Sequence, residues 1–247
     1  MTNVELAVHN AREIFDIKNF PGNFFNIMKN ITIDSDDILL FKEDIGKLSG
    51  FIGYGEKDLV VICVNYKRPI GHQNFTLAHE LGHYFIHKGE CISDKDSNLY
   101  SNYYVEKEAN DFASELLYPK ANRVKDYEFI IENNLFRFDN RKALAIFIDD
   151  CCHKYCLSFE MVLRKVLYEA HKFDEYKKVR KEIEKALGSK ISEYFDKDFY
   201  VPNDELEEYQ MSKEPYKKLE KDVDRLLENE KIGTATAESI KYRYGLL

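Results

Sequence analysis

The stretch FTLAHELGHYFIHKG, at residues 75–89, carries two histidines four positions apart, His79 and His83. Residues at i and i+4 lie on one face of an α-helix, so both imidazoles can reach a single metal ion. Glu80 projects about 100° further round the helix axis and can reach a water on that ion without being a ligand. Two ordinary surface histidines on an amphipathic helix are the alternative. Gly82, inside the same helix, is expected to let another segment approach closely.

A third protein ligand is needed if the ion is a catalytic zinc, because such sites leave the fourth position to water or substrate. The stretch YVEKEANDFASELLYP, at 104–119, offers this ligand on a second predicted helix. Glu106 shares one helical stripe with Asn110, whose side chain could hydrogen-bond a ligating histidine. The spacing therefore favours Glu106 over Glu108, which faces elsewhere. A solvated helix carboxylate is the alternative for both.

The distribution of glycine predicts turns and strands before residue 90 and helices after it. Two β-rich runs, at 48–55 and 58–65, predict a hairpin connected at residues 55–58. The second run is apolar throughout, as a buried strand would be. Predicted helices cover residues 3–17, 72–87, 102–117, 119–132, 140–154, 158–171, 174–187, 212–229 and 234–244.

Composition and charge exclude several classes of protein. The 247 residues carry a net charge of −8, and 44% of them are hydrophobic, as in an ordinary globular protein. The longest strongly apolar run, at 59–64, is far shorter than the roughly 20 residues of a membrane span. No signal peptide is visible, and five cysteines suit free thiols in a reducing compartment. We therefore expect a cytoplasmic protein without a general nucleic-acid surface.

The two quoted helices together resemble the ImmA/IrrE family of metallopeptidases. In that family an F-T-x-A-H-E-x-x-H helix precedes a helix with a glutamate, a small polar residue and a terminal L-x-P. The resemblance covers residues 1–125 and implies a Zn²⁺ site on His79, His83 and Glu106, with Glu80 as the catalytic glutamate. It also implies an α+β fold, in which a small thermolysin-like core with a short sheet precedes a mostly α-helical C-terminal region.

Three regions are expected along the chain. They are a zinc metallopeptidase domain at 1–125, a helix-turn-helix-like segment at 126–172 and a helical C-terminal region at 173–247. Relatives often have a helix-turn-helix-like segment after the peptidase core. A packing or substrate-docking role is favoured over DNA reading, because the second helix of the segment carries only Arg164 and Lys165 near its middle.

Several other side chains have two interpretations each. Cys151, Cys152, His153 and Cys156 are either a second metal site or buried thiols on a helix, and buried thiols are favoured. His87 continues the stripe of His79 and His83, and it either points past the ion or contacts substrate.

Two interpretations also apply nearer the expected cleft. A Cys91 thiolate could occupy the open metal position and hold the enzyme latent, although a plain free thiol is favoured. Tyr54, Tyr103 and Tyr104 are close to the expected cleft, and one of them could hydrogen-bond an oxyanion.

Two functions fit these residues. The first is a zinc-dependent endopeptidase, whose substrate the resemblance implies to be a helix-turn-helix transcriptional repressor. Cleaving it would derepress stress, phage or mobile-element genes. The second is a regulatory binding protein, such as an antirepressor or a toxin–antitoxin component, with a structural or vestigial zinc site. The complete motif favours the first, because a decayed site is expected to lose Glu80 first.

Overall fold

The computed structural model describes residues 1–28, 32–33, 36–54, 59–88, 99–202, 213–243 and 246. Its main elements in chain order are α1 (Asn3–Ile14), β1 (Thr32–Ile33), β2 (Asp36–Glu43), β3 (Gly50–Tyr54), β4 (Leu59–Asn65), α2 (Ile70–His87), α3 (Leu99–Leu117), α4 (Lys120–Glu132), α5 (Arg141–Tyr155), α6 (Phe159–Glu169), α7 (Tyr176–Leu187), α8 (Ile191–Tyr194), α9 (Lys197–Tyr200), α11 (Lys213–Glu228) and α12 (Thr234–Arg243). A short sheet followed by a long run of helices confirms the expected α+β class.

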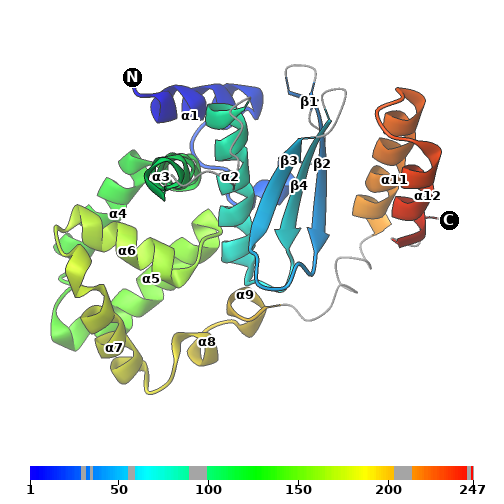
Figure 1. Cartoon of the computed structure of the whole chain (residues 1–247). Helices are drawn as coiled ribbons and strands as arrows, with labels where there is room; N and C mark the ends of the chain where they lie inside the picture. Colours follow the sequence, from blue (N-terminus) through cyan, green and yellow to red (C-terminus); the bar gives the residue numbers. More distant parts are fainter. Residues whose placement is uncertain are drawn as a thin grey trace.

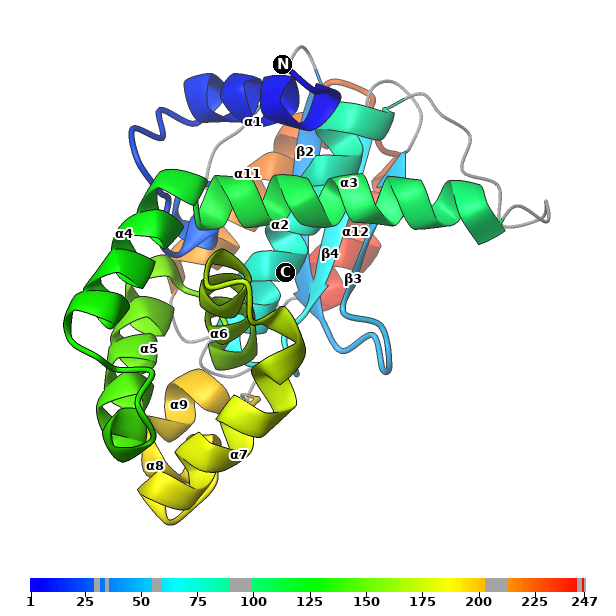
Figure 2. The same cartoon turned by 90° about the vertical axis from the view of Figure 1, so that its left-hand side faces the viewer.

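Helices cover the sheet on both sides. Figure 1 shows α2 against one face of the sheet, with α1 and α3 beyond it, while α11 and α12 lie on the opposite side. In the view of Figure 2, α3 crosses in front of α2, and α4 to α9 form a group of helices below it. The helix α2 is therefore enclosed between the sheet and the other helices.

The sheet has the strand order β1-β2-β4-β3 within the described residues. Strands β3 and β4 pair antiparallel, with Ile52 opposite Ile62, as the predicted hairpin requires. Their connection at 55–58 lies outside the described residues. Strand β2 is absent from the predicted elements. It pairs parallel to β4, with Leu40 opposite Ile62. Because β3 lies between these two strands in the sequence, no local sequence signal indicates that they pair.

Strand β4 is apolar throughout because both faces of the sheet are covered. Val60 and Ile62 are buried in the main core on the α2 side. Val61 points the other way and packs with Leu39 of β2 and Leu226 of α11. The alternation follows from the two-residue period of a strand.

The turn between α5 and α6 packs directly on the first helical turn of α2. A Cβ atom on Gly71 would lie 2.4 Å from the carbonyl carbon of Leu157 and 2.5 Å from the backbone nitrogen of Ser158. The Ser158 side chain also caps α6 by accepting a hydrogen bond from the backbone N–H of Met161 at 3.2 Å. Only a residue without a side chain fits between these two backbones.

The buried side chain of Asn74 joins α2 to two distant segments. Its Nδ2 donates to the backbone oxygens of Gly22 at 2.9 Å and Cys156 at 3.0 Å. Its Oδ1 accepts from the backbone N–H of Phe24 at 2.7 Å. These bonds satisfy a polar group that is fully buried and fix the position of α2 along its axis.

The predicted helices of the C-terminal half are present, with ends that differ by a few residues. Two short helices, α8 and α9, lie in a stretch for which no element is predicted. One cluster of buried side chains extends from Ala7 in α1 to Phe199 in α9. Among the described residues, no helix combines the length and the apolar character that crossing a membrane requires.

Replacing Gly71 with alanine should lower the free energy of unfolding by about 1–3 kcal/mol through overpacking. This loss should outweigh the roughly 1 kcal/mol that alanine contributes as a better helix former. Denaturant titration measures the difference. Gly53→Ala is the matched control, because nothing lies within 4 Å of a Cβ atom there, and it should shift stability by less than about 0.5 kcal/mol. Equal stability of the two variants would contradict the close packing at Gly71.

Candidate metal centre

Helix α2 carries the two histidines, and its packing decides where they point. Leu77, Ala78 and Leu81 are fully buried in the main core. With these residues fixed, His79 and His83 project from the opposite part of the helix, toward α3. The side chain of His79 is 16% exposed and that of His83 is 9% exposed.

Helices α2 and α3 touch backbone to backbone at Gly82. A Cβ atom on Gly82 would lie 3.0 Å from the Cα atom and 3.1 Å from the backbone oxygen of Ala109. This confirms the expectation that Gly82 allows a close approach. Because α3 lies so near, the short side chains of Glu106 and Asn110 can reach the histidines of α2.

Three side chains converge where the helices cross. The Nε2 atoms of His79 and His83 are 3.1 Å apart. The Glu106 carboxylate lies 3.3 Å from His79 Nε2 and 3.5 Å from His83 Nε2, through its two different oxygens. Glu106 is 57% exposed, so the group opens to solvent on the α3 side.

The donor set fits a zinc ion. With ligand bonds of about 2.0–2.1 Å, donor atoms around a tetrahedral zinc lie roughly 3.3 Å from one another. The three observed separations lie close to this value. Two imidazoles and one carboxylate are also a common ligand set of catalytic zinc sites in proteins. His79, His83 and Glu106 are the one group of metal-ligand type found among the residues that the structure describes.

Asn110 lies behind His79, as its place on the stripe of Glu106 suggests. Its Oδ1 is 3.2 Å from His79 Nδ1, so the ring N–H donates to the amide oxygen and leaves Nε2 with a lone pair. Burial lowers the pKa of His79. Burial, together with the nearby His79 and His87, lowers the pKa of His83 to about 4. Both rings are therefore neutral near pH 7, the form that binds metals.

Glu80 is buried between α2 and strand β3. Burial and the nearby Glu106 carboxylate raise the pKa of Glu80 to about 7, while a hydrogen bond from the Ile52 backbone N–H acts in the opposite direction. A Cβ atom on Gly50 would lie 3.3 Å from Glu80 Oε1. The strand therefore confines the carboxylate near the Glu106 side of the site.

His87 and Glu108 form a pair beside His83. His87 Nδ1 is 3.2 Å from His83 Nδ1, and His87 Nε2 is 3.2 Å from Glu108 Oε2. The His87 side chain is only 3% exposed, which argues against its contacting substrate. Glu108 does not join His79, His83 and Glu106, as expected. Its contact with His87 is not predicted by the sequence analysis. The histidine stripe at 79, 83 and 87 is the sequence signal that could have revealed this pair.

The cysteines of α5 belong to the core. Cys151, Cys152 and Cys156 are buried free thiols, and burial raises the pKa of Cys151 to about 12 and that of Cys156 to about 11. His153 lies against the ring of Phe199 instead. The favoured interpretation as buried thiols therefore agrees with the structure.

The remaining candidates from the sequence are Cys91 and three tyrosines. Cys91 lies outside the described residues. Tyr54, Tyr103 and Tyr104 are all more than half exposed, and the rings of Tyr103 and Tyr104 contact each other at 5.8 Å.

The helix-turn-helix-like segment uses its second helix for packing. Val162 and Val166 of α6 are fully buried. Arg164 donates to Glu160 at 2.8 Å, and its guanidinium lies 3.8 Å from the ring centroid of Tyr176. Burial lowers the pKa of Lys165. These contacts favour the packing role over DNA reading.

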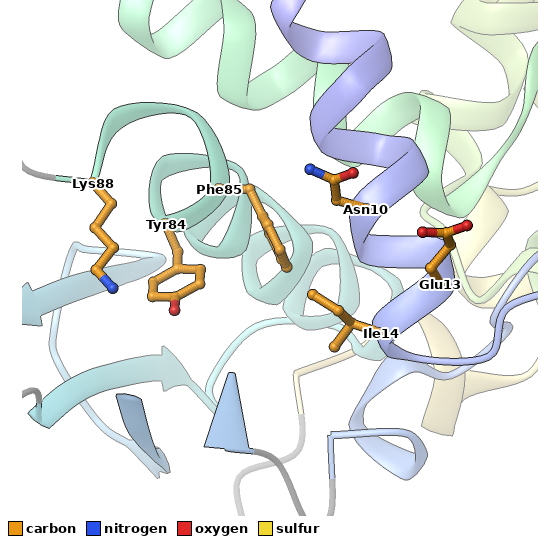
Figure 3. Close-up of a pocket in the computed structure, with 6 residues that line it drawn as sticks. All are labelled: Asn10, Glu13, Ile14, Tyr84, Phe85 and Lys88. Carbon is orange, nitrogen blue, oxygen red and sulfur yellow. The ribbon is translucent and has the colours of Figure 1, made fainter. Parts of the chain in front are cut away.

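A pocket of about 350 Å³ lies between α1 and the end of α2 (Figure 3). Its lining residues are Asn10, Glu13, Ile14, Tyr84, Phe85 and Lys88. Tyr84 and Phe85 project about 100° and 200° away from His83 around the helix axis. The pocket is therefore separate from the histidine face.

The purified protein should bind about one zinc ion per chain, and Glu106→Gln should weaken binding by more than about 100-fold, beyond the usual effect of losing only a supporting hydrogen bond. Asp111→Asn removes the same charge from α3, but Asp111 pairs with Lys107 at 2.9 Å, so its zinc affinity should stay near that of the wild type. Competition with a chromophoric chelator measures both. Equal affinities for the two variants would remove Glu106 from the ligand set.

Comparison with known proteins agrees with this geometry. Residues 35–123 match the family model described as the IrrE N-terminal-like domain. Metallopeptidase ImmA of Bacillus subtilis (strain 168) is 33% identical over 95 residues, a stretch that covers 34% of this chain and 50% of that relative. The residues matched by the family model include both α2 and α3. Residues 35–123 are therefore similar to the IrrE N-terminal-like domain, and the chain spans half the length of the relative from Bacillus subtilis.

Proposed function

We propose that this protein is a zinc-dependent endopeptidase that cleaves a specific intracellular protein. The observation that carries the proposal is the convergence of His79, His83 and Glu106 at separations of 3.1 to 3.5 Å, with the Glu80 carboxylate beside them. The relative from Bacillus subtilis is named a metallopeptidase, which supports the same chemistry.

His79, His83 and Glu106 would hold the zinc. Zinc in such a site supplies Lewis acidity, which activates water and polarises a peptide carbonyl. Glu80 would accept the proton of the attacking water and pass it to the leaving amine. Its burial at 7% exposure keeps competing water away from the carboxylate, and the Ile52 N–H holds the carboxylate in one orientation.

Among the described residues the site offers three protein ligands rather than four, and this favours a catalytic site over a structural one. Structural zinc sites are normally closed by four protein ligands, whereas catalytic sites leave one position open. Among the described residues, the donor group has three members, and one of them, Glu106, is exposed to solvent on the open side. A regulatory binding protein with a structural or vestigial zinc would need neither the open side nor Glu80.

The proposed substrate is a helix-turn-helix transcriptional repressor, as the ImmA/IrrE resemblance implies, and its cleavage would derepress stress, phage or mobile-element genes. Specificity for one protein requires contacts beyond the scissile bond. The exposed side of the metal centre lies along α3, where Tyr103 and Tyr104 are 63% and 64% exposed. These side chains are available to contact a bound polypeptide.

Glu80→Gln should keep its zinc but cleave the repressor encoded nearest to it about 100- to 10,000-fold more slowly than the wild type, the usual range for losing a general base. Gel analysis of the cleavage and metal analysis of the same samples measure both properties. Equal cleavage by Glu80→Gln and wild type would contradict the role of Glu80, and no cleavage by the zinc-loaded wild type would contradict the choice of substrate.

His79→Ala separates the two candidate functions. If the protein is an endopeptidase, this variant should lose zinc and cleavage but still bind the partner protein, because the binding surface extends beyond the metal centre. Calorimetric titration of the variant with the partner gives the affinity. If wild type and His79→Ala act equally on the partner, a binding function without zinc chemistry is the better description.

A further inference from the structure

Two further contacts link His83 of the metal centre to His87 and Glu108. His83 Nδ1 lies 3.2 Å from His87 Nδ1, and His87 Nε2 lies 3.2 Å from Glu108 Oε2. The three side chains come from two helices and form a continuous line from the exposed surface of α3 to the candidate ligand His83. The exposed fraction falls from 38% at Glu108 to 3% at His87.

These contacts restrict where the ring protons can lie. A carboxylate only accepts hydrogen bonds, so His87 must carry its proton on Nε2. His83 Nδ1 and His87 Nδ1 lie within hydrogen-bonding distance, so one of these two nitrogens donates and the other accepts. A neutral His83 that carries its proton on Nδ1 has a lone pair on Nε2, the atom that faces His79 and Glu106. When His83 is the donor of this pair, His87 Nδ1 accepts, and the contact with Glu108 holds the His87 ring in the orientation that presents Nδ1 to His83.

We propose that His87 and Glu108 are positioning residues that hold His83 in its metal-binding tautomer and ring orientation. This inference rests on the zinc site of the proposed function. His79 has a matching arrangement, because its Nδ1 donates to Asn110. Each candidate histidine ligand therefore has its own acceptor, a single amide for His79 and a histidine–carboxylate pair for His83.

If His87 only filled space, it would not need polar partners at both ring nitrogens, yet His83 lies at Nδ1 and Glu108 at Nε2. His87 is enclosed at the last turn of α2, and its ring lies 5.3 Å from that of His83 between centroids. Packing alone would be satisfied by a phenylalanine, which has a similar shape but no acceptor. The substitution His87→Phe therefore separates packing from positioning.

The first test uses the metal-free, full-length protein with ¹⁵N-labelled histidine rings. At a pH well above the ordinary histidine pKa, the ring nitrogen shifts report which nitrogen carries the proton. Wild-type His83 should be protonated on Nδ1, and His87→Phe should move the proton of His83 largely to Nε2. An unchanged tautomer of His83 in His87→Phe would overturn the proposal without involving zinc or substrate.

The second test measures zinc affinity by chelator competition. His87→Phe should bind zinc about 10- to 100-fold more weakly, the usual effect of losing a hydrogen bond to a ligand. His87→Asn should recover most of this affinity, because the amide oxygen replaces Nδ1 as the acceptor. Glu108→Gln should be intermediate, since an amide can accept or donate. Asp111→Asn removes the same charge from α3 and should bind as the wild type does.

The outcomes distinguish this inference from the proposed function. If the wild type binds zinc and cleaves protein while His87→Phe and Glu108→Gln bind zinc equally well, only the positioning role is wrong. If the wild type binds no zinc, the zinc site and the positioning role fail together. If His87→Phe does not fold, the ¹⁵N shifts and the zinc affinity of Glu108→Gln decide, because Glu108 is partly exposed and its replacement leaves the core intact.

Discussion

The close contact between α2 and α3 at Gly82 is the constraint on which the rest of the site depends. A Cβ atom at this position would lie 3.0 Å from the Cα atom of Ala109, so the two helix axes can approach only if residue 82 has no side chain. Ala109 is followed by Asn110 and preceded by Glu108, and Glu106 lies one helical turn before Asn110. The residues that reach the histidines therefore surround the contact, and a wider separation would move all of them away together.

The rest of the fold keeps α2 in place for this contact. The sheet packs on one side of the helix, α3 packs on another, and the α5–α6 turn meets its first turn at Gly71. Asn74 adds hydrogen bonds to the segment before β1 and to Cys156. A metal centre needs ligands that are held before the ion arrives. Here the helices from the C-terminal half of the chain contribute to that rigidity, because they share one core with α2.

Polar groups on α2 are costly to bury, and each of those near the site has a specific partner. Asn110 accepts from His79, Glu108 accepts from His87, and the Ile52 N–H reaches Glu80. These partners also orient the groups for chemistry. The same hydrogen bonds that make burial tolerable direct the Nε2 atoms of His79 and His83 toward a common point. Stability and the candidate function therefore rest on the same contacts.

The local features of this protein can be predicted from its amino-acid order. The i, i+4 spacing of His79 and His83 on one predicted helix, and of Glu106 and Asn110 on another, pointed to the candidate ligands. Most helices follow from periodicity and capping within a few residues. The contacts between distant segments, in contrast, become visible only in the folded chain. Strand β2 pairs with β4 although β3 lies between them in the sequence, the α5–α6 turn packs on Gly71, and Glu108 contacts His87. The physical reason is that a helical or strand period shows which face of an element is apolar, whereas the choice of the partner for that face depends on how all the elements pack together.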